Sequence, residues 1–420
     1  MPRVLLAGVS MRAAAASAVR AGFDVAVVDA FGDLDLPPAA SRFTPPGGPA
    51  GFTVPAALRA ARAVRCDAVA YGPAFEHCPR GVSALARGRE LFGNAPDVLR
   101  RIRHPATLFS ALERHGFPVP RTLPPGAHDG ATAGHWLQKP LRSGGGHGIK
   151  PWLGEPLASA DWYLQEHLDG VAGSIVFAAA AGGVQPLLVS RQLAGNHAFG
   201  ATGSRYCGSI ASSPGDLFGD GDAVVTCAAA LARAVTREFG LVGVNGLDFI
   251  ARDGVAWPLE VNPRWCASME LIERAGGPSV FAAHVAACTG AVRDAAPLRR
   301  SGALGKAIVF ARETCVAGDT HPWIEDDDLA DIPVPGVRIP AGGPICTVFA
   351  EAETASACHA ALVRRAVRVY AEVETWHAPG APGPKPPEAR SLKPEASVRL
   401  QTSSSTLPLF CGTTGPAAAA

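Results

Sequence analysis

Several common signals are missing from this chain of 420 residues. Its 10 cysteines include no C-x-x-C pair or other zinc-ligand spacing, which excludes a zinc ribbon, and the chain is too long for a small disulfide scaffold. No run of 18 clean apolar residues appears, so nothing predicts a membrane span. With 38 basic and 37 acidic side chains the net charge is +1, and charge alone gives no reason to expect nucleic acid or an anionic membrane as a partner.

The residues that are present indicate a globular protein of two or three domains. A composition of 48% hydrophobic and 18% charged residues excludes a wholly disordered chain. The first apolar run, VLLAG, imitates a secretory signal, but Arg12 interrupts it and a second strand-like run, DVAVVDA, follows Gly22. We therefore expect a cytoplasmic protein with reduced and mostly buried cysteines.

Strand and helix signals alternate through residues 1–95. The runs VLLAG, DVAVVDA and DAVAYG are separated by Ala-rich helical segments, which predicts a small parallel α/β domain. Gly8 opens the first turn, and Asp29 ends the second strand-like run. The turn lacks the second and third glycines of G-x-G-x-x-G, so an ordinary first turn is favoured over a dinucleotide site.

The segment LDFIARDGVAWPLEVNPR predicts a β-hairpin, because two short apolar runs flank the turn dipeptide Asp253-Gly254. Glu260 and Asn262 are two residues apart and therefore point to the same face of the second strand. Asp248 lies on the first strand. The length of the loop decides whether its side chain joins the other two.

Two loop lengths are compatible with this hairpin. A two-residue turn pairs Arg252 with Val255 and places Asp248 on the face opposite to Glu260. A three-residue loop pairs Ala251 with Val255 and places both carboxylates on one face. In this second register two carboxylates and one amide oxygen converge with open positions, which suits Mg²⁺. The alternative is a surface hairpin with ordinary solvated acids.

The segment LQKPLRSGGGHGIK has the composition of an anion-binding loop. Four glycines within residues 143–148 let consecutive backbone N–H groups face an anion. Lys139 ends a strand-like run and can place a charge on a phosphate, and Arg142 can reinforce it. The pattern is not the G-x-x-x-x-G-K-S/T loop, and the alternative is a plain surface turn. Further on, the strand-like WYLQE ends in Gln165-Glu166, which fits either a hinge pairing with an adenine edge or a simple strand end.

Together and in this order, these elements resemble the ATP-grasp superfamily. Its members have a lysine before a Gly-rich loop, then an adenine-binding hinge, then an acidic residue and E-x-N-x-R on a later hairpin. The E-x-N-x-R form resembles the biotin carboxylase and carbamoyl-phosphate synthetase branch. The runs NPRWCASMELIE, GKAIVFA, LADIPVPG and GGPICTVFA also resemble an uncharacterised carboligase-like group found in archaea and one-carbon-metabolising bacteria.

The resemblance implies an α/β plus α+β architecture in three folded parts followed by a tail. The parts are a small N-terminal Rossmann-like domain (1–95), an ATP-grasp domain (96–295) with a nucleotide lobe (about 120–170) and a catalytic lobe (about 171–295), and a C-terminal β-rich segment with a closing helix (296–377). Residues 378–420 are rich in Pro, Ser, Thr and Ala, and we expect them to be disordered.

The resemblance also implies ATP with Mg²⁺, or Mn²⁺ in its place, as cofactors. It assigns the metal to Asp248, Glu260 and Asn262, and catalytic roles to Arg264 and Lys139. The nucleotide-binding set that it implies is Lys139, Arg142, Ser143, Gly144, Gly145, Gly146, Gln165, Glu166 and Leu168. Arg191 and Arg205 follow strand-like runs and are the candidates for holding a substrate carboxylate.

The sequence departs from the family pattern at two points. An earlier phosphate-binding lysine often precedes the G-x-P-x-P run, but only Arg101, Arg103 and His104 precede it here. The usual ribose-binding glutamate after the hinge is also missing, and Glu166 or Asp169 is left to serve.

The predicted function is that of an ATP-dependent carboxylate–amine ligase that forms a C–N bond through an acyl phosphate. The carboligase-like group suggests a place in the biosynthesis of a one-carbon-carrier cofactor. The alternatives are a bicarbonate-activating, carboxylase-like enzyme and a non-catalytic nucleotide-binding protein. We expect a small-molecule carboxylate and an amine as partners, no nucleic acid, no membrane, and the homodimer that is common in the family.

Overall fold

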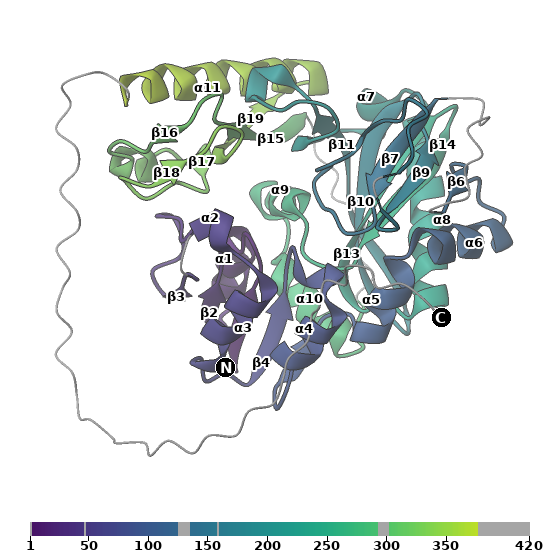
Figure 1. Cartoon of the computed structure of the whole chain (residues 1–420), viewed down its shortest axis with the longest axis horizontal. Helices are drawn as coiled ribbons and strands as arrows, with labels where there is room; N and C mark the ends of the chain where they lie inside the picture. The colour runs from purple at the N-terminus through teal and green to yellow at the C-terminus, as the bar shows by residue number, and fades with distance from the viewer. Residues whose placement is uncertain (1, 46–47, 125–134, 158, 293–301, 377–420) are drawn as a thin grey trace, which may run out of the picture. The chain divides into compact units, whose positions relative to one another are not determined.

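The structure is a computed structural model that describes residues 2–45, 48–124, 135–157, 159–292 and 302–376. Its three larger sheets have five, four and eight strands (Figure 1). The tail predicted to be disordered, residues 378–420, lies outside the described residues. Within the described ranges, none of the helices combines the length and the apolar character that crossing a membrane requires.

The N-terminal sheet is parallel throughout, in the order β3-β2-β1-β4-β5, which confirms the predicted alternation of strands and helices. Its strands are β1 (Arg3–Ala7), β2 (Asp24–Val28), β3 (Ser41–Phe43), β4 (Ala68–Tyr71) and β5 (Glu90–Phe92). Apolar residues on both faces are buried, because α1 (Arg12–Arg20) packs on one side and α3 (Val54–Arg62) with α4 (Pro79–Leu85) on the other. The order of strands reverses direction between β1 and β4, and in open parallel sheets the carboxyl ends at such a point form a crevice.

A four-stranded antiparallel sheet follows, in the order β6-β9-β7-β8. Its strands are β6 (Thr122–Leu123), β7 (Trp136–Pro140), β8 (Lys150–Pro151) and β9 (Trp162–Glu166), and the helices before it are α5 (Pro96–Ile102) and α6 (Pro105–Arg114). Lys139 lies opposite Tyr163 in this sheet, so both side chains point to the same face.

The eight-stranded sheet has the order β14-β13-β10-β11-β12-β15-β19-β17. Its strands are β10 (Val171–Ala180), β11 (Gly183–Ala194), β12 (Tyr206–Ala211), β13 (Gly243–Arg252), β14 (Val255–Asn262), β15 (Ala303–Phe310), β17 (Leu329–Ala330) and β19 (Pro344–Ala352). The strand-rich C-terminal segment therefore extends the sheet that carries the hairpin. The closing helix is α11 (Ala355–Thr375), which packs on β15 and β19 (Figure 1).

The two faces of this sheet differ in chemistry. Apolar residues of one face pack against α8 (Gly221–Phe239) and α11, for example Phe249 against the helix residue Leu231. The opposite face carries a row of polar side chains on neighbouring strands, in which Asp248 lies opposite Ser174, and Ser209 lies opposite Lys306. The alternation of apolar and polar residues along each strand produces this division, and it brings the predicted metal ligands to the polar face.

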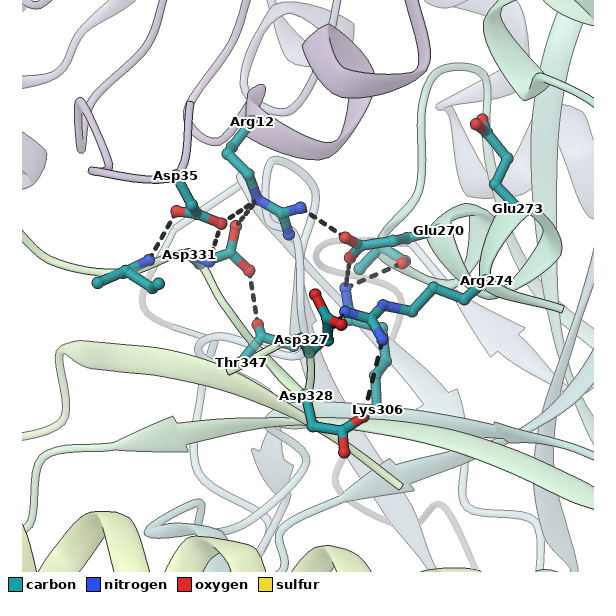
Figure 2. A network of polar contacts seen from close by, with 12 residues as sticks. Arg12, Asp35, Glu270, Glu273, Arg274, Lys306, Asp327, Asp328, Asp331 and Thr347 are labelled. Atoms are coloured by element: carbon teal, nitrogen blue, oxygen red, sulfur yellow. Dashed lines mark hydrogen bonds and ion pairs between the residues drawn. The ribbon is translucent and has the colours of Figure 1, made fainter. Parts of the chain in front are cut away.

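A buried network of charges joins the N-terminal helix α1 to this polar face. Figure 2 shows Arg12 between Asp35, Asp331 and Glu270; its Nη1 lies 2.6 Å from Glu270 Oε1, and its Nε lies 3.0 Å from Asp331 Oδ1. Lys306 donates to the second oxygen of Glu270 over 2.7 Å. Glu270 begins α9 (Glu270–Arg274), and α10 (Val280–Cys288) follows it. Burial alone would raise the pKa of Glu270, but the two cations keep it far below its usual range.

Candidate active site

The hairpin of β13 and β14 closes with a two-residue turn. Arg252 lies opposite Val255, and the turn residues Asp253 and Gly254 have φ angles of +52° and +72°. Two central residues with positive φ are typical of a type I′ turn, which Asp-Gly favours. The three-residue loop, the register that would have brought the ligands together, is therefore wrong.

A β-bulge nevertheless places Asp248 directly opposite Glu260. The ladder pairs Phe249 with Pro258 and then skips Leu259, so one extra residue in β14 reverses the facing that the turn alone would give. Pro258 has no N–H to give to a ladder, and β14 is an edge strand, where both proline and bulges are tolerated. The predicted convergence of the ligands is thus reached through a bulge.

The three predicted metal ligands meet on the polar face. The Nδ2 group of Asn262 donates to Asp248 Oδ2 over 2.9 Å and to Glu260 Oε1 over 3.5 Å. Gln192, which was not predicted, donates to Asp248 Oδ1 over 2.8 Å. Burial and the neighbouring Glu260 carboxylate raise the pKa of Asp248 to about 7. Burial would also raise the pKa of Glu260, but Arg103, Lys139 and Arg264 bring it below its usual value.

The donor set fits a hard divalent cation such as Mg²⁺, because all three groups offer oxygen and the carboxylates repel each other without a cation. The described residues contain no cluster of three or more His, Cys, Asp and Glu residues that could hold a metal, so the amide of Asn262 is an essential member of the set. Its NH₂ group bridges the two carboxylates here, and a half-turn of the amide presents the oxygen instead.

Lys139 lies across a small cavity from these ligands. Its ammonium group donates to Gln165 Oε1 over 2.9 Å, and only 8% of the residue is exposed. A cavity of about 40 Å³ lies between Lys139, Glu260 and the loop residues Ser143, Gly144 and Gly146. A larger cavity of about 290 Å³ adjoins it beside α6 and shares Tyr163 with it. The second volume approaches the range of about 300–1,000 Å³ that is typical of small-molecule sites.

The glycine-rich loop (residues 143–148) is closed onto the eight-stranded sheet. Tyr206 donates its backbone N–H to Gly145 O over 3.0 Å. Gly146 has a φ of +76°, and any side chain there would collide with the carbonyl oxygen of Ser204. The loop needs glycine at this position for its backbone conformation and for its close approach to the sheet. Arg142 is exposed and does not line the cavity between Lys139 and Glu260.

Arg103 occupies the place for which the sequence offered three candidates. Its Nη1 donates to Glu260 Oε2 over 3.1 Å and to Val261 O over 2.9 Å, and its Nη2 donates to Ser143 O of the glycine-rich loop over 3.2 Å. Arg101 instead donates to Phe239 O and lies over the Phe239 ring. One turn of helix separates the two, and only the fold distinguishes them.

Arg264 lies beside the metal ligands, and its Nη2 donates to Asn262 Oδ1 over 3.2 Å. Its Nε forms an ion pair of 2.5 Å with Glu76, a residue of the N-terminal unit that the sequence did not single out. Burial would lower the pKa of Arg264, but Glu76 raises it above the usual value. No local pattern around Glu76 announces this contact, because 188 positions separate the two residues.

The predicted hinge and substrate residues have mixed outcomes. The side chain of Gln165 binds Lys139, and the backbone N–H of Glu166 donates to Arg121 O, so that N–H is engaged within the protein; Leu168 is buried. Arg191 lies opposite Ile210 on the helix-covered face, whereas its neighbour Gln192 faces Asp248. Arg191 therefore does not join the site.

Arg205 is next to the glycine-rich loop in the chain's path, but its guanidinium group turns elsewhere. It stacks on the ring of Phe310 at 3.6 Å, and burial lowers its pKa. A stacked arginine is held by the aromatic face rather than by a carboxylate. In this conformation Arg205 is directed to Phe310 and not to the metal ligands.

Comparisons with known proteins agree with this geometry. Residues 106–268 match the ATP-grasp domain family. Similar solved structures include pyruvate carboxylase of Rhizobium etli (TM-score 0.67, 15% identity, 87% of this chain and 37% of that one), the biotin carboxylase–ATP complex of Campylobacter jejuni (0.62, 14%, 86% and 89%) and L-amino acid ligase of Bacillus licheniformis (0.61, 15%, 88% and 97%). A search of curated proteins gave no significant match.

The resemblance to the ATP-grasp superfamily is thereby confirmed, and residues 106–268 are an ATP-grasp domain. The chain spans about 37% of the length of the pyruvate carboxylase but almost all of the L-amino acid ligase. At identities near 15% the solved structures speak for the fold alone.

Proposed function

We propose that the protein is an ATP-dependent ligase that joins a small-molecule carboxylate to an amine through an acyl phosphate. One observation carries the proposal: the bulge that sets Asp248 opposite Glu260, with Asn262 between them, in front of Lys139 and the glycine-rich loop. This is a site for the outer phosphates of a nucleotide with a cation, and phosphoryl transfer needs mainly positioning and charge neutralisation.

The side chains divide this work. Asp248, Glu260 and Asn262 would hold Mg²⁺, or Mn²⁺ in its place, which when bound neutralises phosphate charge. Lys139 and Arg103 approach Glu260 from the other side of the cavity and place positive charge where phosphates would lie. Three of the nearest cations thus surround one carboxylate, and a triphosphate would share them.

The remaining contacts serve the transfer itself. Arg264 stabilises the charge that develops on the transferred group, since its Nη2 edge lies next to Asn262 and near Gly144. The closed loop excludes water that would otherwise hydrolyse the acyl phosphate. The cavity of about 290 Å³ beside Tyr163 is the space we assign to the nucleoside, adjoining the predicted Lys139 and lined in part by Phe109 and Thr122.

The biological setting that we propose is a ligation step in making a one-carbon-carrier cofactor, in the cytoplasm and by a homodimer. This part follows from the resemblance of four sequence runs to the carboligase-like group. Bicarbonate activation is the competing chemistry on the same site, since bicarbonate also carries an oxygen nucleophile for the γ-phosphate. Release of ADP with bicarbonate alone, independent of any amine, would favour the competing chemistry.

The test is a screen followed by one substitution. The full chain is incubated with MgATP and pooled carboxylates and amines, and ADP and product masses are measured. Once a pair is found, Glu260→Gln should lower turnover about 100-fold or more, since even the partners behind metal ligands are worth about 10–100-fold. Raising the Mg²⁺ concentration should restore part of the loss.

Asp253→Asn is the matched control for Glu260→Gln. It removes a carboxylate from the same hairpin at the exposed tip, where the side chain of Asp253 is 86% exposed, and asparagine also tolerates the positive φ. Its turnover and its Mg²⁺ dependence should match the wild type. ADP release by Glu260→Gln at the wild-type rate would exclude the metal site, and MgATP binding without turnover for any pair would favour a non-catalytic nucleotide-binding protein.

A further inference from the structure

We infer that Glu76, in the turn after β4, is the positioning residue of Arg264, so that the N-terminal unit completes the phosphoryl-transfer site of the ATP-grasp domain. The inference rests on the proposed function, in which Arg264 stabilises charge on the transferred group. Glu76 itself is not placed against the phosphates. It acts through the arginine, whose orientation it fixes.

The hydrogen bonds of Arg264 show how its orientation is fixed. Its Nε donates to Glu76 Oε1 over 2.5 Å, its Nη1 to Trp265 O over 2.9 Å, and its Nη2 to Asn262 Oδ1 over 3.2 Å. Glu76 thus holds the edge of the guanidinium that is nearest to its own chain. Of its atoms, Nη2 lies closest to the glycine-rich loop, 3.9 Å from the Cβ position of Gly144. The free donor capacity of Nη2 is therefore on the side of the loop.

The surroundings of Glu76 make this pair specific. Only 1% of Glu76 is exposed, and its second oxygen, Oε2, is buried without a hydrogen-bond partner. Besides Arg264, the nearest cationic groups are His77 and Arg103. A buried carboxylate with one strong donor depends on that donor, and the arginine depends on the carboxylate in turn.

The backbone that delivers Glu76 is strained. Ala74, two residues before it, has a φ of +84°, a value that residues with a Cβ adopt only when the surrounding structure enforces it. Such strain is tolerated where a particular side-chain placement is needed. The turn lies at the carboxyl ends of the N-terminal strands, beside the point where strand order reverses, and in an α/β sheet a ligand often occupies this crevice.

In this protein the crevice holds the end of the hairpin instead. Tyr71, the last residue of β4, donates its hydroxyl to Pro263 O over 3.2 Å. Asn94, which follows β5, donates to the same carbonyl over 3.2 Å and to Asn245 Oδ1 over 2.8 Å. The N-terminal unit thus holds the backbone before Arg264 with two side chains and the guanidinium with a third.

The experiment measures the affinity of the full chain for MgATP and for MgADP by calorimetry. The ratio of the two dissociation constants isolates contacts with the γ-phosphate. Arg264→Ala should lower the preference for ATP by about tenfold or more, as expected for the loss of one charge-assisted hydrogen bond. Glu76→Gln, which keeps shape and one acceptor oxygen, should lower it several-fold.

The double variant decides whether Glu76 acts through Arg264. If it does, adding Glu76→Gln to Arg264→Ala should leave the ATP preference where Arg264→Ala alone put it. An ion pair that matters only for folding would change the unfolding midpoint without changing the ATP preference. The double variant also removes both buried charges, and it therefore remains a folded reference if either single variant is unstable.

Glu90→Gln is the matched control, because Glu90 is an exposed acid of β5 in the same sheet; its ATP preference should equal that of the wild type. Two results would overturn the inference alone: an unchanged ATP preference in Glu76→Gln while Arg264→Ala loses it, or a further loss in the double variant. A wild-type chain that binds neither nucleotide would overturn the proposed function, and the inference with it.

Discussion

Arg103 is the residue whose position most changes the expected chemistry of the site. An arginine replaces a lysine poorly where a compact point charge is required, but its planar fork can reach two groups at once. Here it reaches Glu260 and the carbonyl oxygen of Ser143, so it links the metal hairpin to the glycine-rich loop. We therefore expect Arg103 to serve as the earlier phosphate-binding cation of the site.

Arg103→Ala should raise the dissociation constant of MgATP about tenfold or more, the value expected for one lost charge-assisted contact. The measurement is calorimetric titration of the full chain. Arg101→Ala provides the control, because this neighbouring cation binds Phe239 O on the far side of α5 and should leave nucleotide affinity unchanged. Equal losses in the two variants would argue for a general effect of charge or folding.

At the scale of elements, the loop and the hairpin are fitted to each other. The hairpin brings its carboxylates to one face by means of a bulge, and the loop closes over that face through the contact of Gly145 with Tyr206. Closure depends on glycine at position 146, where the backbone and the Ser204 carbonyl leave no room for a Cβ. A loop that cannot close would still let nucleotide enter but would leave water in the site.

Gly146→Ala should therefore lower turnover by roughly 10- to 100-fold, the scale expected when a catalytic group is misplaced by about 1 Å. The affinity for MgADP should change little, and the uncoupled release of ADP relative to product should rise. Gly144→Ala is the control, because Gly144 has no positive φ and the nearest atom to its Cβ position is Arg264 Nη2 at 3.9 Å. Full coupled turnover in Gly146→Ala would show that closure is dispensable.

At the scale of the whole molecule, the N-terminal unit and the eight-stranded sheet are joined by buried charges as well as by apolar packing. Arg12 of α1 is only 6% exposed and faces three acids from separate segments (Figure 2). A buried ion pair adds little net stability compared with apolar packing, but removing one partner leaves a buried charge without compensation. The network thus penalises any separation of these elements.

Arg12→Ala should lower the free energy of unfolding by about 3–5 kcal/mol, the usual effect of breaking a buried pair. Arg20→Ala, in the same helix, removes a partner of Glu273 that is 56% exposed and should change stability by at most about 1 kcal/mol. Urea unfolding at pH 7 measures both. Comparable losses in the two variants would mean that the Arg12 network is effectively solvated.

The sequence alone determined what depends on local patterns. Alternating strand and helix signals predicted the parallel N-terminal sheet, and the spacing of Glu260 and Asn262 predicted a common face. The order of lysine, glycine-rich loop and E-x-N-x-R predicted the ATP-grasp domain that residues 106–268 match. These features are local because strand periodicity and backbone freedom are properties of consecutive residues.

Only the tertiary structure decided which residues meet across long separations. The bulge at Leu259 overrode the facing set by the turn, because Pro258 cannot donate to the ladder and the edge strand tolerates an extra residue. Choosing Arg103 over Arg101, and pairing Glu76 with Arg264, required the packing of the N-terminal unit against the hairpin. A contact between residues 188 positions apart leaves no periodic trace in the chain, so packing alone specifies it.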